Sequence, residues 1–336
     1  MFQKLSIFTA VLLIMVGITA LVFAQVFGNL VPLSKGFLQR KSFSLHFGWI
    51  FTTSGIVLYC LLSPFQIRQF LFVILGTAIG AWLCFGALIY GFQDTLLFSP
   101  RGLSEARRLR ILEQYSHIEE ITISTENDVV LHGWLIYATT SKPAPLILVF
   151  AGQGGEASRY LELSQKIPQC SWAFINYRGY GLSEGQPTEG ALFQDAEVIF
   201  DYFTRHAAVD HERIFALEGS LGTGVAVYLA AQRPLAGVIL FSPYDKIGGG
   251  VAQDLIPLLP TRLLITNSFH VVPYASHAQA PALAIIGEND KVICPERSYQ
   301  LMKHWSRSHK LFLVPEGDHY SIYNDDQSWQ AVSSFI

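Results

Sequence analysis

Hydrophobic residues dominate the first 92 positions of the chain. Charged side chains are rare between Leu5 and Phe92, and three long apolar runs occur there, at about residues 6–27, 47–62 and 70–92. The first and third are long enough to cross a bilayer as helices, because about 20 apolar residues span its hydrocarbon core. The second run is shorter. We expect it to span as well, with a buried or interfacial helix as the alternative.

The first run has a second interpretation, a cleaved signal peptide. It is longer than an ordinary signal core, and no small-residue cleavage site precedes a polar start, so an anchor is the better interpretation. Orientation follows from the basic residues after the first and third runs, because Lys and Arg collect on the cytoplasmic side. With three spans both groups lie on that same side. The pattern predicts a multi-pass integral membrane protein with a cytoplasmic C-terminal domain. The basic residues are Lys35, Arg40, Lys41, Arg101, Arg107, Arg108 and Arg110.

From about Glu119 onward, short apolar runs alternate with stretches of helical periodicity. Residues 121–125 and 129–138 read as two strands joined by a polar turn, and 146–151 as a buried strand. Further strands follow, separated by sequence that can form helices. Such alternation predicts an α/β fold, with a mostly parallel sheet and helices on both faces. We therefore expect a transmembrane region at 1–93 and an α/β domain at 94–336, with ligands bound beyond the carboxyl ends of the strands.

Composition narrows the functional classes. The chain of 336 residues is 51% hydrophobic and only 15% charged, where about a quarter is usual for soluble domains. The net charge of -3 and the lack of a basic tract give no reason to expect nucleic-acid binding. The four cysteines do not form a disulfide framework. We expect neither a metal nor an organic cofactor.

Ser220 is the candidate nucleophile. It lies between a predicted strand at 214–217 and a helix that begins at Leu221, in the stretch RIFALEGSLGTGVAVYLAAQR. A serine on a sharp strand-to-helix turn exposes its hydroxyl above the sheet, beside backbone N–H groups that favour negative charge. In the usual G-x-S-x-G pattern a glycine stands where this chain has Glu218. The alternative is a glycine-rich turn without chemistry.

A serine hydroxyl needs a base, and the base needs a carboxylate to orient it. In this fold the chain order is serine, acid, histidine. Of the histidines after Ser220, only His319 directly follows a predicted strand. Asp290 also follows a strand, and we favour it as the acid over Asp245. Asp318 adjoins His319 too closely in sequence to orient it.

The oxyanion of the reaction needs two backbone N–H donors. The first is expected from Leu221, the residue after the nucleophile. The second is expected from the loop AGQGGEAS after the strand at 146–151, with Gln153 as the donor. The same glycines could instead serve only to reverse the chain.

Several motifs from Asp94 onward resemble one family, the membrane-anchored α/β-hydrolases of the Bem46-like, serine aminopeptidase-like group. The resemblance implies an α/β-hydrolase fold with a short cap and a cofactor-free activity on esters, thioesters, lysolipids or peptides. This chain departs from the family pattern at two positions. Glu218 stands where a glycine is usual, and Ala151 begins an oxyanion loop that usually begins His-Gly. The matching stretches are DTLLFSP, LHGWL, INYRGYGLSEGQPTEGALFQDA, SLGTGVA, FSPYD and IIGENDKVICP, with the loop around His319.

These observations predict a membrane-anchored serine hydrolase that cleaves esters or thioesters, with lipid-like acyl groups as candidate substrates. Ser220 would attack, His319 would act as base and then acid, and Asp290 would orient His319. Two alternatives stay open. One is a serine peptidase of the same fold, and the other is a non-catalytic membrane protein that keeps the fold as a binding module.

Overall fold

The computed structural model describes residues 67–125, 128–140, 143–150 and 153–336, together with the isolated positions 13, 14, 17, 52 and 54. The predicted membrane segments at 6–27 and 47–62 therefore lie almost wholly outside the described residues. Contacts divide the chain into two units, one of residues 1–93 with 252–264, the other of 94–251 with 265–336. We call them the membrane unit and the hydrolase unit, and each is described by itself.

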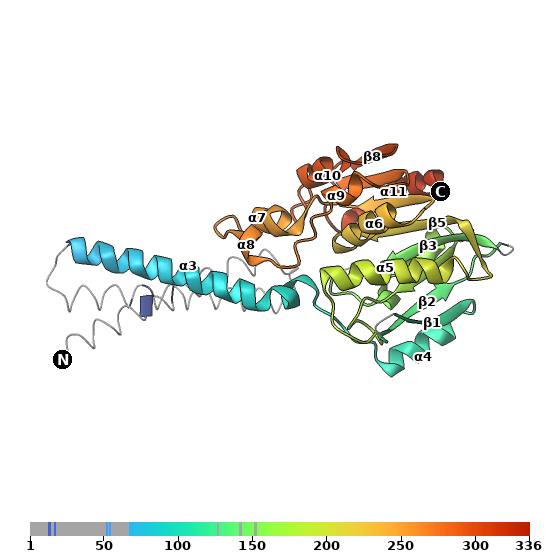
Figure 1. The fold of residues 1–336 in the computed structure, drawn as a ribbon, viewed down its shortest axis with the longest axis horizontal. Coiled ribbons are helices and arrows are strands. Elements are labelled where there is room, and N and C mark those ends of the chain that lie inside the picture. The colour runs from blue at the N-terminus through green and yellow to red at the C-terminus, as the bar shows by residue number, and fades with distance from the viewer. Residues whose placement is uncertain are drawn as a thin grey trace. The chain divides into compact units, whose positions relative to one another are not determined.

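The described part of the membrane unit centres on the long helix α3 (Ile67–Leu97; Figure 1). Its stretch Leu71–Leu97 has a mean hydropathy of 2.2 and is long and apolar enough to cross a membrane. Many of its large apolar side chains are exposed, including Phe72 and Leu83. Two short helices, α7 (Ala252–Leu255) and α8 (Thr261–Leu264), belong to the same unit. Among the described residues, one predicted span is thus present as a helix, and the multi-pass topology stays a prediction.

The hydrolase unit is built on one eight-stranded sheet with the order β1-β2-β4-β3-β5-β6-β7-β8 (Figure 1). The pairs β1–β2 and β2–β4 are antiparallel, and all later pairs are parallel. The predicted hairpin of two strands before residue 140 is confirmed as β1 and β2. The strands are β1 (Ile118–Ser124), β2 (Val130–Ile136), β3 (Ala144–Phe150), β4 (Ser171–Ile175), β5 (Val209–Gly219), β6 (Gly237–Phe241), β7 (Ala282–Gly287) and β8 (His309–Val314).

Helices connect the parallel strands and cover the sheet. Every residue of β4, β6 and β7 is buried, as is expected for largely apolar strands in a sheet covered on both faces. The predicted α/β class, with helices around a mostly parallel sheet, is confirmed. The α-helices are α4 (Glu105–Gln114), α5 (Glu189–Phe203), α6 (Leu221–Gln232), α9 (Val272–Ala275), α10 (Pro295–Met302) and α11 (Asp326–Phe335). Shorter turns are η1 (Ala157–Arg159), η2 (Leu161–Lys166), η4 (Ser321–Tyr323) and the irregular η3 (Ile247–Val251).

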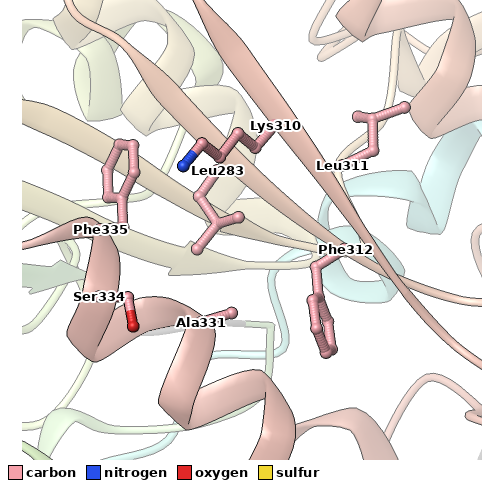
Figure 2. A pocket seen from close by; sticks show the side chains of 7 residues that line it. All are labelled: Leu283, Lys310, Leu311, Phe312, Ala331, Ser334 and Phe335. Carbon is pink, nitrogen blue, oxygen red and sulfur yellow. The ribbon is translucent and has the colours of Figure 1, made fainter.

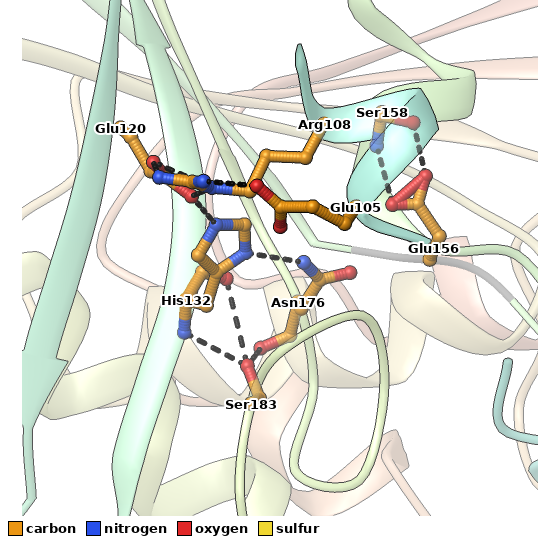
Figure 3. Close-up of polar contacts among 8 residues, drawn as sticks. All are labelled: Glu105, Arg108, Glu120, His132, Glu156, Ser158, Asn176 and Ser183. Carbon is orange, nitrogen blue, oxygen red and sulfur yellow. Dashed lines mark hydrogen bonds and ion pairs between the residues drawn. The ribbon is translucent and has the colours of Figure 1, made fainter. Parts of the chain in front are cut away.

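A polar network joins α4 to the antiparallel edge of the sheet (Figure 3). Arg108 and the ring of His132 both bond the carboxylate of Glu120, the ring through Nε2 at 2.7 Å. The amide nitrogen of Asn176 lies 3.2 Å from His132 Nδ1, and the hydroxyl of Ser183 accepts the His132 N–H at 2.8 Å. Because the amide donates to Nδ1, Nε2 carries the proton that Glu120 accepts. The hydrogen bonds of this buried histidine therefore hold neighbouring segments together, and none of them involves a candidate catalytic residue.

A small hollow lies at the other end of the sheet, between the last two strands and α11 (Figure 2). It is lined by Leu283, Lys310, Leu311, Phe312, Ala331, Ser334 and Phe335. None of the candidate catalytic residues is among them. The hollow therefore plays no part in the site described next.

Candidate active site

The three candidate catalytic residues come together at the carboxyl ends of the strands. Ser220 follows β5, Asp290 follows β7 and His319 follows β8. His319 Nε2 lies 3.1 Å from Ser220 Oγ, and His319 Nδ1 lies 2.8 Å from Asp290 Oδ2. Both distances are within hydrogen-bonding range. The geometry is that of a nucleophile, a base and an orienting acid, in the chain order expected from the sequence.

Ser220 lies on a strained turn between β5 and α6. Its φ of 52° and ψ of -125° lie in a region that non-glycine residues rarely adopt. Its backbone N–H donates to the Phe241 carbonyl at 3.0 Å, which ties the turn to the end of β6. The turn also makes Ser220 the N-cap of α6, so that its side chain lies at the positive end of the helix.

Close packing explains the residues that flank the serine. A Cβ on Gly219 would lie 1.6 Å from the hydroxyl oxygen of Tyr323, so any larger residue there would require the tyrosine to move. A Cβ on Gly222 would lie 2.2 Å from the Glu218 carboxylate. The side chain of Glu218 therefore occupies the space that Gly222 leaves open. The unusual glutamate and the glycine four residues later are complementary.

Glu218 is 2% exposed, and one of its carboxyl oxygens accepts a hydrogen bond from the backbone N–H of Phe150. Burial raises its pKa well above the ordinary value, and the Phe150 N–H opposes that only in part. Burial therefore favours the protonated form of this carboxyl in the folded protein. Phe150 is the last residue of β3, directly before the predicted oxyanion loop.

Asp290 is held by more donors than His319 alone. Ser242, which follows β6, donates its hydroxyl to Asp290 Oδ2 at 2.6 Å. The N–H groups of Val292 and Ile293 donate to Asp290 Oδ1 at 2.8 and 2.9 Å. Burial alone would raise the pKa of Asp290, but the bonds from His319, Ser242 and Ile293 outweigh it, and the pKa lies below its ordinary value. The carboxylate is therefore ionised at neutral pH.

The other acids near the site have different partners. The Asp245 carboxylate lies 3.4 Å from the guanidinium of Arg297, and His319 Nδ1 is bonded to Asp290. Asp318 accepts the N–H groups of Tyr320 and Ser321, which shapes the loop that carries His319. The structure thus places Asp290, and neither alternative, against the histidine.

The two predicted oxyanion donors have unequal support. Leu221 is the first residue of α6, where a backbone N–H has no acceptor within the helix. Gln153 follows Ala151 and Gly152, which lie outside the described residues. Its side-chain amide donates to the Leu96 carbonyl, and the next N–H, of Gly154, donates to Phe98 at 3.0 Å. These bonds tie residues 153 and 154 to the chain at Leu96 and Phe98, and the donor role of Gln153 stays a prediction.

Sequence reasoning missed Ser242 and Tyr323. Both residues lie in segments that follow strands, where functional residues are expected. A serine or a tyrosine is common in such segments, however, and only the folded structure shows that these two contact Asp290 and Gly219. No group of three or more His, Cys, Asp or Glu side chains that could hold a metal occurs in the part of the chain that the structure describes.

Comparison with known proteins assigns the chain to a family. Residues 181–321 match the family model for serine hydrolase (FSH1). An uncharacterized protein of Mycobacterium tuberculosis is 30% identical over 202 residues, 60% of this chain and 72% of that protein. The chain belongs to the α/β-hydrolase superfamily.

Other proteins are similar to this chain over more of its length. The bem46 protein of Schizosaccharomyces pombe is 24% identical, over 74% of this chain and 87% of its own. An uncharacterized membrane protein of Saccharomyces cerevisiae is 28% identical, over 74% of this chain and 90% of its own. The esterase Pf2001 of Pyrococcus furiosus has the same fold, with a TM-score of 0.54 and 19% identity, over 70% of this α/β-hydrolase and 97% of the esterase. The predicted Bem46-like resemblance is confirmed.

Proposed function

We propose that this α/β-hydrolase is a membrane-anchored serine hydrolase that cleaves carboxylic esters or thioesters through an acyl-serine intermediate. The observation that carries the proposal is the continuous chain of hydrogen bonds from Ser220 Oγ through His319 to Asp290. A serine with neither a base nor an acid would have only weak nucleophilicity.

Each residue has a definite task in this reaction. His319 Nε2 takes the proton of Ser220 as its oxygen attacks the acyl carbon, and then gives that proton to the leaving alcohol or thiol. Asp290 fixes the ring with Nδ1 protonated and stabilises the positive charge that the ring gains. Water, activated by the same ring, then hydrolyses the acyl-serine and restores the enzyme.

The negative charge on the acyl oxygen needs fixed donors. The Leu221 N–H, at the start of α6, and the Gln153 N–H are the two that we assign. Because these donors act on the tetrahedral intermediate, they lower the barrier to both acylation and deacylation. They would serve an ester, a thioester or an amide, so they do not by themselves select the substrate.

Two observations favour an acyl substrate at a membrane. The helix α3 is long and apolar enough to hold the protein in a bilayer, where amphipathic and acylated molecules collect. Structural neighbours include Pf2001 and an acetyl xylan esterase of Paenibacillus, both esterases by name. The catalytic machinery would face the cytoplasm if all three predicted spans cross the membrane.

Hydrolysis by the purified protein in detergent tests the proposal. Substrates are p-nitrophenyl esters and acyl thioesters of graded chain length, with aminoacyl amides for comparison. We expect ester or thioester turnover that Ser220→Ala and His319→Ala abolish, while Ser334→Ala, an exposed serine on α11, leaves it unchanged. Turnover of amides alone would indicate the peptidase, and activity retained in Ser220→Ala would refute the proposed nucleophile.

A further inference from the structure

A second apolar segment packs against the membrane helix within the membrane unit. This segment, residues 252–264, consists of α7, a Pro-Leu-Leu-Pro turn and α8. The indole N–H of Trp82 on α3 donates a 2.7 Å hydrogen bond to the Leu258 carbonyl. A Cβ on Gly86 would lie 3.8 Å from the side chain of Leu259, so the segment lies close to the backbone of α3. The family resemblance implied only a short cap, and it did not predict this contact with the membrane helix.

The outward face of this segment is unusually apolar. Leu258 and Leu263 are 78% and 80% exposed, the highest values among the large hydrophobic side chains that the structure describes as exposed. Leu259 and Ile256, by contrast, are buried. Exposed leucines beside an apolar helix indicate a surface that contacts lipid or a protein partner.

The polar groups of the segment suit a lipid environment. Thr261 donates its N–H and its hydroxyl to Gln253 Oε1 at 3.3 and 3.0 Å, and Gln253 Nε2 donates to the Pro257 carbonyl at 3.0 Å. In hydrocarbon, polar groups must find partners inside the protein, which these do. The charged residues Asp254 and Arg262 are exposed near the two ends of the segment, and no charge lies between them.

The contact lies inside the apolar stretch of α3. The 31 residues of this helix extend about 46 Å, longer than the hydrocarbon core of about 30 Å. Trp82 lies within its apolar stretch Leu71–Leu97, so the segment that it contacts lies beside a part of the helix that can cross the hydrocarbon core.

We propose that segment 252–264 is a second membrane-embedded element, with Leu258 and Leu263 among the acyl chains of the lipid. The inference rests on the proposed anchoring by α3. The chain leaves for this segment from the end of β6 and returns to β7, the strands that precede Ser242 and Asp290. The segment is thus inserted in the chain between two strands whose ends precede residues of the proposed site.

Spin labels test the location directly. Single cysteines replace Leu258, Leu263, Leu75 or Leu109 in a cysteine-free background of the full chain, reconstituted in phosphatidylcholine–phosphatidylglycerol vesicles. Leu75 is exposed on α3, and Leu109 is an exposed leucine on α4 of the hydrolase unit. Oxygen concentrates in hydrocarbon, whereas a water-soluble nickel chelate does not enter it, so the ratio of their effects on the label reports its depth.

We expect labels at 258 and 263 to be relaxed more by oxygen than by nickel, as at 75, with the opposite ratio at 109. Labels at 258 and 263 that behave like the one at 109, while 75 behaves as in lipid, would overturn this inference and leave the anchoring intact. A label at 75 that is exposed to nickel would overturn both this inference and the proposed anchoring by α3. Neither readout depends on catalytic activity, so the proposed hydrolase reaction is tested separately.

Discussion

The carboxyl group of Glu218 accepts a hydrogen bond from the backbone N–H of Phe150, and so connects the turn that carries the nucleophile to the end of β3. The residue occupies a position where a glycine is usual. Since Phe150 precedes the predicted oxyanion loop, Glu218 is placed to position that loop rather than to take part in the chemistry. Its neutral form, favoured by burial, needs no charged partner.

Two substitutions of Glu218 should distinguish the effect of its hydrogen bond to Phe150 from the effect of its ionisable group. Glu218→Gln keeps an oxygen that accepts the Phe150 N–H, so we expect kcat to stay within about twofold of the parent. Glu218→Leu leaves that N–H without an acceptor and should lower kcat by about tenfold, since small misplacements of catalytic groups are costly. Steady-state ester hydrolysis measures both. Equal losses in the two variants would show that the charge, and not the hydrogen bond, matters.

The stability conferred by Glu218 should depend on pH. Its pKa is raised in the folded state, so its contribution is complete below the ordinary glutamate pKa of about 4.3 and is lost as pH rises toward the folded value. The difference in unfolding free energy between the parent and Glu218→Gln should therefore fall with rising pH, by at most about 1.4 kcal/mol per pH unit. Denaturant titrations of both proteins in detergent measure it. A difference that grows with pH would mean that the buried group is ionised.

Ser242 should act through Asp290. Ser242→Ala removes the 2.6 Å hydrogen bond to Asp290 Oδ2 but leaves those from Val292 and Ile293. The loss of one such bond is worth about 1 kcal/mol, so kcat should fall by roughly fivefold with little change in KM. Asp290→Asn should reduce kcat far more, because it also disturbs the tautomer of His319. If Ser242→Ala changed neither kcat nor its pH profile, Ser242 would not be a residue that positions Asp290.

Gly219 should tolerate no side chain. Gly219→Ala places a Cβ 1.6 Å from the Tyr323 hydroxyl oxygen, so both stability and activity should drop. Tyr323→Phe removes that oxygen, and the double variant should recover part of the loss, which a double-mutant cycle measures. Gly190→Ala is the matched control, because a Cβ there meets nothing within 4 Å and helix α5 gains an alanine. A double variant no better than Gly219→Ala alone would show that the clash is not with that hydroxyl.

The sequence predicted those features that depend on local pattern. Ser220, Asp290 and His319 each follow an apolar run, and parallel strands bring their carboxyl ends to one edge, so their positions could be expected together. Ser242 and Tyr323 could not be singled out, because their value lies in contacts with Asp290 and Gly219 that sequence spacing does not show. In the sequence, Glu218 is only a departure from the motif. The space that Gly222 leaves for its side chain exists only in the folded turn. The packing of residues 252–264 against Trp82 joins segments more than 160 residues apart, and no periodicity predicts it.

A fluorophosphonate probe, which reacts with activated serines, tests whether Ser220 is the nucleophile. The intact protein is treated in detergent, digested, and searched by mass spectrometry for the modified peptide. We predict one modified residue, Ser220, with labelling slowed strongly in His319→Ala and unchanged in Ser334→Ala. A folded protein that takes up no probe, or that takes it up on another serine, would show that Ser220 is not an activated nucleophile.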